Sequence, residues 1–210
     1  MTRPFEGIRI IDITHVLAGP FAAYQLAVLG ADVIKVEHPD DPDQSRGSGT
    51  DRALNRMQMG TGFLTQGSNK RSITLDLKQE AGRAILRRLV AGADVLVQNY
   101  RPGAFEALGL GYEAMLEINP RLIYGQVKGF GTGSPYEHSL AFDMIAQAAG
   151  GPTSVTGEAD RPPVKPGPSF GDTGTGMLMA ISILGALYKR SQSGQGRRLQ
   201  VAMQDAMIHY

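Results

Sequence analysis

Short runs of β-branched and apolar residues alternate with helical segments along this chain, and no other feature constrains the fold as strongly. Ile8–Ile13 and Asp32–Glu37 are typical strands. Between them, Pro20 is well placed in the first turn of a helix, and Gly30 is a typical helix end. A strand, a helix and a second parallel strand form a right-handed βαβ unit. The N-terminal segment therefore predicts the start of a parallel sheet.

The same alternation continues to the C-terminus. Further strands are predicted at Ser72–Leu75, Asp94–Asn99, Arg121–Val127 and Arg198–Val201. Helices are predicted from Gln79 to Val90, near 105–108 and 112–117, from Ala141 to Ala149, and over Met177–Tyr188. The segment from His38 to Gly67 lacks periodicity and is predicted to be a long loop. The whole pattern predicts an α/β, Rossmann-like fold, a mostly parallel sheet with helices on both faces.

Ligands of such sheets bind beyond the carboxyl ends of the strands. Four segments follow predicted strands at that edge: Thr14–Gly19, His38, Asn99–Gly103 and Lys128–Gly131. The first of them lacks the G-x-G-x-x-G pattern of dinucleotide sites. Glu37 resembles a ribose-binding acid, but without those glycines an NAD site is disfavoured.

The composition excludes several classes of function. The chain has 210 residues, with 21 basic and 20 acidic side chains and a net charge of +1. This balance argues against nucleic-acid binding as its main task. The absence of cysteine excludes disulfides, thiolate metal sites and a cysteine nucleophile, and no metal site is expected. Residues 1–7 lack the apolar core of a signal peptide, so we expect a cytoplasmic location and no membrane contact.

A glycine-rich sequence, Gly171-Asp172-Thr173-Gly174-Thr175-Gly176, precedes the apolar run Met177–Tyr188. That run is too short to span a membrane, and it predicts a buried helix. Asp172 then lies at or just before the N-terminus of the helix. It is either an N-cap residue, which this stretch alone favours, or a functional carboxylate in the field of the helix dipole. An ordinary Asp is almost fully ionised at neutral pH. The helix dipole therefore affects the ionisation of Asp172 mainly if burial raises its pKa.

Several motifs, taken together and in order, resemble the family III CoA-transferases. These motifs are Gly7–Asp12 with Ala18-Gly19-Pro20, Gly30–Glu37, Asn69–Ser72, Asn99–Gly103, Gly171-Asp172 and Met203–Ala206. The superfamily includes formyl-CoA:oxalate CoA-transferase, carnitine CoA-transferase and α-methylacyl-CoA racemase. The resemblance runs from end to end of the chain. Because family members are considerably longer, residues 1–210 resemble their CoA-binding and catalytic N-terminal part, with the second domain absent.

The resemblance implies a reaction and a nucleophile. Transferases of this family attack an acyl-CoA thioester with an Asp at the position of Asp172, and form an aspartyl-acyl anhydride, then an aspartyl-CoA thioester and finally the new acyl-CoA. Glycine-flanked backbone N–H groups would suit the developing oxyanion. The implied partners are an acyl-CoA and a small carboxylic acid. Coenzyme A is then a substrate, and no permanently bound cofactor is expected. Family members form interlocked homodimers.

The resemblance also implies a set of CoA contacts, among which Arg101 is the favoured phosphate-binding cation. The set is Leu17, Ala18, His38, Leu75, Asp76, Leu77, Lys78, Asn99, Tyr100, Arg101, Leu140, Ala141, Phe142 and Asp143. His38 and Arg101 are otherwise ordinary polar surface residues. Lys70 and Arg71 are equally well explained as solvated side chains.

Two positions depart from the family pattern. Formyl-CoA transferase has Gln at the position of Leu17 and Tyr at that of Phe142, so its substrate specificity is in doubt here. Racemases have a catalytic His at the position of Phe142, and Phe cannot accept a proton. His138 is four residues away and an improbable substitute. A transferase is therefore favoured over a racemase, and a CoA-binding module without turnover is the non-enzymatic alternative.

The C-terminal residues raise a question of packing. Ala202, Met203, Ala206 and Met207 form an apolar stripe with no following segment to cover it. The apolar run Met177–Tyr188 also requires neighbours on every side. The sequence therefore predicts an exposed apolar patch at 202–210, self-association of the isolated chain and little transferase activity, whereas CoA binding is expected to survive.

Overall fold

The computed structural model describes residues 3–210 and contains one six-stranded sheet with all neighbouring strands parallel, in the order β3-β2-β1-β4-β5-β6. The strands are β1 (Arg9–Asp12), β2 (Asp32–Glu37), β3 (Lys70–Thr74), β4 (Val95–Gln98), β5 (Ile123–Lys128) and β6 (Arg197–Ala202). The chain order reverses between β1 and β4, the point at which ligands of such sheets usually bind. The predicted α/β, Rossmann-like fold is confirmed.

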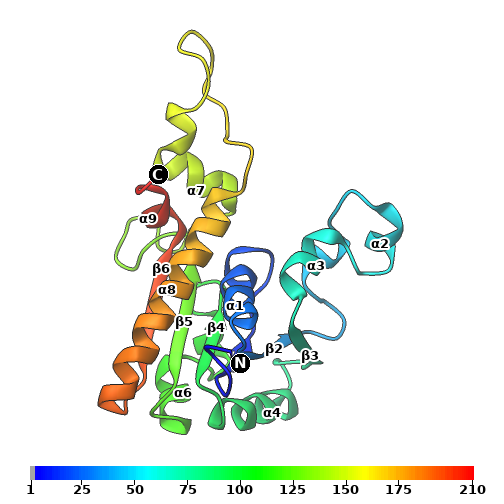
Figure 1. Cartoon of the computed structure of the whole chain (residues 1–210), viewed down its shortest axis with the longest axis vertical. Helices are drawn as coiled ribbons and strands as arrows, with labels where there is room; N and C mark the ends of the chain where they lie inside the picture. The colour runs from blue at the N-terminus through cyan, green and yellow to red at the C-terminus, as the bar shows by residue number, and fades with distance from the viewer. Residues whose placement is uncertain (1–2) are drawn as a thin grey trace.

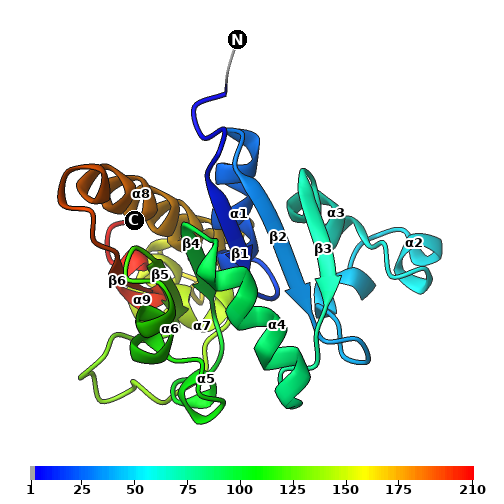
Figure 2. The ribbon, with the colours of Figure 1, turned by 90° about the horizontal axis from the view of Figure 1, so that it is seen from below.

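Helices cover both faces of the sheet, as Figure 2 shows. The helices are α1 (Ala18–Val28), α2 (Arg52–Arg56), α3 (Thr61–Gly67), α4 (Glu80–Ala91), α5 (Ala104–Ala107), α6 (Tyr112–Ile118), α7 (Asp143–Gly150), α8 (Phe170–Ser193) and α9 (Met203–Met207), with 3-10 turns η1 (Gln44–Gly47) and η2 (Pro152–Val155). The segment predicted as a long loop after His38 thus contains η1, α2 and α3. Figure 1 shows α2 and α3 at the margin of the molecule, beside β3.

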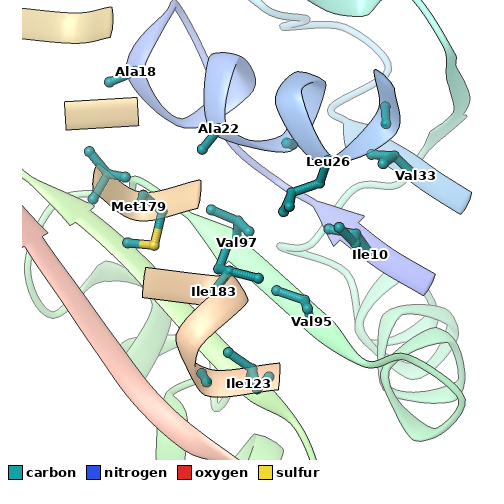
Figure 3. Close-up of a cluster of buried hydrophobic side chains, with 14 of the residues drawn as sticks. Ile10, Ala18, Ala22, Leu26, Val33, Val95, Val97, Ile123, Met179 and Ile183 are labelled. Atoms are coloured by element: carbon teal, nitrogen blue, oxygen red, sulfur yellow. The ribbon is translucent and has the colours of Figure 1, made fainter. Parts of the chain in front are cut away.

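Alternate strand residues build two separate cores. Ile10, Val97 and Ile123 face α1 and α8. Figure 3 shows Leu26 of α1 and Ile183 of α8 directed toward these strands. The opposite core, on the α4 and α6 side, contains the intervening residues such as Ile11 and Leu96. Each such aliphatic side chain contributes about 1.5–3 kcal/mol on burial, so the two-sided apolar pattern fixes a sheet covered on both faces.

Helix α8 extends further in both directions than its apolar run suggested. It has 24 residues, and its length and composition would suffice to cross a membrane, but half of its most apolar window is buried inside the fold, as in a core helix. Gly176 allows the close approach of α1, because a Cβ there would lie 2.6 Å from the carbonyl oxygen of Ala18. The described residues supply only some of the neighbours that this apolar helix requires, since Met177, Ile181 and Tyr188 are exposed.

The C-terminal apolar stripe is covered, contrary to the prediction from the sequence. Met203, Ala206 and Met207 are buried against α7 and α8, and Ala202 is only 4% exposed. The elements that cover them come earlier in the chain, which a linear reading could not show. Only Ile208 and Tyr210 of this segment expose large apolar surface in the described structure.

Candidate active site

Asp172 is the third residue of α8 and lies in its first turn. Ser169 is the N-cap residue, so the interpretation of Asp172 as the N-cap is wrong. The residue is only 8% exposed, yet it lines a cavity of about 540 Å³. A buried carboxyl group that lines a cavity is a candidate for chemistry rather than for capping.

The walls of this cavity come from the carboxyl edge of the sheet. They include the turn between β1 and α1, the segment after β4, the end of β5 and the segment before α7. Of the residues that the family resemblance implied, this cavity brings together Leu17, Ala18, Asn99, Tyr100, Arg101, Leu140, Ala141 and Phe142 with Asp172. Segments distant in the sequence thus meet at one site because all their strands are parallel.

A second cavity of about 410 Å³ lies beyond β2 and β3. His38, Leu75, Leu77 and Lys78 from the implied set line it. Four residues, His15, Val16, Tyr100 and Phe142, line both cavities. The two cavities are therefore adjacent and share a wall to which the turn after β1, Tyr100 and Phe142 contribute.

Asp76 and Asp143 are outside both sets of lining residues. Oδ1 of Asp76 lies 3.4 Å from Nε2 of His38. Asp143 instead connects α7 to the start of α8. Its Oδ1 accepts a hydrogen bond from the backbone N–H of Gly171 at 2.9 Å, and its Oδ2 lies 3.1 Å from Nζ of Lys165. A Cβ on Gly171 would lie 2.9 Å from the carbonyl oxygen of Asp143, so a glycine permits this approach.

The helix start also limits which groups can stabilise an oxyanion. The Gly171 N–H donates to Asp143, and the N–H of Thr173 donates to the carbonyl of Ser169. These two donors of the helix start are therefore occupied. The first turn of α1 is a better candidate, because its N-cap residue Leu17 and first residue Ala18 both line the cavity.

The electrostatic environment of Asp172 is unusual for an aspartate. Burial, reinforced by the neighbouring charge of Asp143, raises the pKa of Asp172 to about 7, while Lys165 acts in the opposite direction. A carboxyl group with this pKa exchanges its proton near neutral pH and is more basic, hence more nucleophilic, than an ordinary aspartate. Burial is the contribution that the sequence could not supply.

Four further polar residues line the Asp172 cavity and were not among the implied contacts: His15, Lys128, Glu137 and Ser139. Nζ of Lys128 donates hydrogen bonds to Glu137 and Thr132, each at 3.1 Å. Burial, together with the positive charge of Lys35, lowers the pKa of His15. His15 and Lys128 belong to segments that the topology placed at the carboxyl edge, but no motif distinguished them from their neighbours.

The pair Lys70 and Arg71 divides into one buried and one exposed cation. The Lys70 side chain is 2% exposed and lies 2.8 Å from Oδ2 of Asp12, so its interpretation as solvated is wrong. Arg71 is 63% exposed and pairs with Asp32 at the surface. Within residues 3–210, no group of three His, Asp or Glu side chains is arranged to hold a metal ion.

Comparison with known proteins places this site in a family. The model of CoA-transferase family III matches residues 5–210. A formyl-CoA:oxalate CoA-transferase from Streptomyces avermitilis is 44% identical and covers 100% of this chain, which spans 50% of that protein. One from Escherichia coli is 41% identical with the same coverage. This chain thus spans about half the length of the curated relatives that it matches.

Solved structures agree with the sequence comparison. A CAIB/BAIF family protein from Brucella suis has a TM-score of 0.91 at 36% identity, covering 100% of this chain and 55% of that one. A hypothetical protein from Mycobacterium tuberculosis has a TM-score of 0.87 at 32% identity, covering 99% and 56% of the two chains. Because the family model extends over nearly every residue and includes the segments that form the cavities, the chain belongs to CoA-transferase family III.

Proposed function

We propose that this chain carries the CoA-binding and nucleophilic part of an enzyme that transfers CoA from an acyl-CoA thioester to a carboxylic acid. The observation that carries the proposal is Asp172, a buried carboxyl group with a pKa raised to about 7, in a cavity at the carboxyl edge of the sheet. Membership of CoA-transferase family III supplies the class of substrate.

In the proposed reaction, an ionised oxygen of Asp172 attacks the thioester carbonyl, the C–S bond breaks, and a mixed anhydride and CoA thiolate result. The thiolate then attacks the aspartyl carbonyl and releases the first acid, which leaves an aspartyl-CoA thioester. The acceptor carboxylate displaces CoA to form a second anhydride. CoA thiolate finally attacks the acceptor carbonyl, which gives the new acyl-CoA and regenerates Asp172.

The two adjoining cavities suit a long ligand such as CoA. We place the thioester end beside Asp172 and the nucleotide end beyond β2 and β3, where Lys78 and His38 line the second cavity. We assign phosphate binding to Arg101, which lines the first cavity, and to the first turn of α1, because cations and helix N-terminal N–H groups favour anions.

The acyl group is expected to differ from that of the named relatives. Those relatives are named formyl-CoA:oxalate CoA-transferases. The family resemblance implies polar residues in such enzymes at the positions of Leu17 and Phe142. Here Phe142 and Leu140, which are 60% and 62% exposed, add apolar surface to the lining of the cavity. We infer that the acyl donor or acceptor carries more apolar surface than formate or oxalate. The homodimer and the second domain remain predictions from the resemblance, and the cytoplasmic location remains a prediction from the N-terminal sequence.

Covalent trapping tests the nucleophile. Hydroxylamine cleaves activated aspartyl carbonyls, so incubation of the chain with acyl-CoA and hydroxylamine is expected to convert Asp172 to a hydroxamate, read by peptide mass spectrometry. Asp172→Asn should remain unmodified at this position, and Asp160→Asn, in an exposed loop, should react like the unchanged chain. Absence of modification in a chain that binds CoA in a titration would favour the binding module without turnover.

A racemase-like reaction is the second candidate, because a histidine, His15, lines the same cavity as Asp172. Burial and Lys35 lower the pKa of His15, which leaves its ring neutral at neutral pH and able to accept a proton. Proton transfer of this kind would exchange the α-proton of a 2-methylacyl-CoA in deuterated water. We expect no exchange. If exchange occurs and either Asp172→Asn or His15→Ala abolishes it, a racemase-like reaction would replace CoA transfer as the proposed function.

A further inference from the structure

The wall between the two cavities depends on a strained turn. Val16 has a backbone φ of +71°, in the left-handed region that β-branched residues rarely adopt. It lines both cavities, as does His15 before it. The next residues, Leu17 and Ala18, begin α1 and line the cavity of Asp172. The conformation of Val16 therefore decides where the start of α1 lies relative to both cavities.

Side chains from separate elements hold this turn. Asp12 accepts a hydrogen bond from the N–H of Thr14 at 3.0 Å, and Lys35 donates to the Thr14 carbonyl at 2.6 Å. Asn99 bonds both the N–H and the carbonyl of His15, at 2.9 and 2.8 Å. The N–H of Val16 donates to Oδ1 of Asp43 at 3.0 Å. The strained residue is thus attached to Asp43.

Asp43 is itself rigidly held. It is 1% exposed, and its Oδ2 lies 3.1 Å from Nζ of Lys35. Its Oδ1 also accepts hydrogen bonds from the N–H and hydroxyl of Ser45, and its own N–H donates to Glu37. Its neighbours Pro42 and Gln44 line the second cavity, whereas Asp43 points away toward Val16. Asp43 therefore joins the wall of one cavity to the turn that separates the two.

We propose that Asp43 is a positioning residue for CoA binding, which holds Val16 in its left-handed conformation so that the start of α1 faces the cavity of Asp172. Without the hydrogen bond from Val16, the valine relaxes to an unstrained backbone region and displaces Leu17 and Ala18. Asp43 acts through Val16 and contacts no ligand. The inference rests on the proposed function, because the conformation of the turn is detected through the affinity of the chain for CoA.

Calorimetric titration with CoA, on the full 210-residue chain, tests the inference through four variants. Asp43→Ala is expected to weaken CoA binding by about tenfold, since the left-handed valine loses its support. Asp43→Asn keeps the acceptor oxygen and should stay within about threefold of the unchanged chain. Val16→Gly adopts φ +71° without strain but removes a side chain that lines both cavities, so its own CoA affinity is the reference for the double variant. The double variant Asp43→Ala with Val16→Gly should bind CoA about as tightly as Val16→Gly alone.

Asp94→Ala is the matched control. Asp94 pairs with the buried Arg190 at 2.6 Å, and it lies just before β4, at the opposite edge of the sheet from the cavities. This substitution should lower the free energy of unfolding in urea but leave CoA affinity unchanged. The control distinguishes a general loss of stability from a displaced turn.

Two results would overturn the inference while leaving CoA binding intact: a folded Asp43→Ala variant with unchanged affinity, or a double variant that binds CoA much more weakly than Val16→Gly alone. If the unchanged chain binds no CoA, the proposed function fails first, and the inference with it. If Asp43→Ala does not fold, hydrogen exchange at the Val16 amide of the unchanged chain tests whether Asp43 holds the turn. Slow exchange supports the bond to Asp43, and exchange at the rate of an exposed amide refutes it.

Discussion

Asp143 accepts a hydrogen bond from the backbone N–H of Gly171 at 2.9 Å, one residue before Asp172. Gln147 donates to both oxygens of the same carboxylate, and Lys165 lies 3.1 Å from one of them. The start of α8 is therefore fixed by a charged residue of α7. This arrangement places a negative charge beside Asp172 and a positive charge beside Asp143.

Substitutions at Asp143 and Lys165 should move the pKa of Asp172 in opposite directions. Asp143→Asn removes a neighbouring negative charge, so the pKa of Asp172 should fall toward its ordinary value. Lys165→Met removes the opposing cation, so the pKa of Asp172 should rise. Carbon-13 NMR titration of the Asp172 carboxyl group measures both shifts. Lys165→Arg is the control and should leave the pKa nearly unchanged, whereas equal values in all variants would exclude this electrostatic link.

Asp172 should make the protein less stable as the pH rises. Its pKa is raised from 3.8 to about 7 on folding, so the folded state binds more protons than the unfolded state between these values. Stability from this group is complete below pH 4 and is lost as the pH rises through 7. The comparison is the free energy of unfolding of Asp172→Asn minus that of the unchanged chain, measured in urea at two pH values. This difference should be ~2–4 kcal/mol larger at pH 8 than at pH 4. A pH-independent difference would contradict the raised pKa.

The ion pair between Lys70 and Asp12 should matter far more than that between Arg71 and Asp32. Lys70→Ala leaves the fully buried carboxylate of Asp12 without its main partner, so the free energy of unfolding should fall by about 3–5 kcal/mol. Arg71 is the adjacent residue but is solvent-exposed, and Arg71→Ala should cost less than about 1 kcal/mol. Urea unfolding of the two variants makes the comparison, and similar losses would mean that burial does not distinguish the pairs.

Two glycines of α8 should respond oppositely to alanine. A Cβ at Gly176 would lie 2.6 Å from the backbone of Ala18, so Gly176→Ala should separate α1 from α8 and destabilise the fold by about 1–3 kcal/mol. At Gly185, no atom of the described residues lies within 4 Å of a Cβ, so Gly185→Ala should stabilise the helix by about 0.5–1 kcal/mol. Thermal unfolding measures both changes. Equal effects would refute the close packing at Gly176.

Several features followed from the sequence. The alternation of strands such as Arg9–Asp12 and Val95–Gln98 with amphipathic helices determined a parallel α/β sheet, because periodicity and β-branched residues act locally. The topology of such a sheet then placed the segments after β1, β4 and β5 at one edge. Motif order pointed to the family and to Asp172.

Tertiary structure decided the environment of those residues. The pKa of Asp172 depends on burial and on Asp143, which is 29 positions away in the chain, and the burial of Met207 depends on α7 and α8. Lys70 is buried because it meets Asp12, 58 residues earlier, across the sheet. Local patterns record which face of an element is apolar, but desolvation and charge pairing depend on distances between segments that only the folded chain brings together.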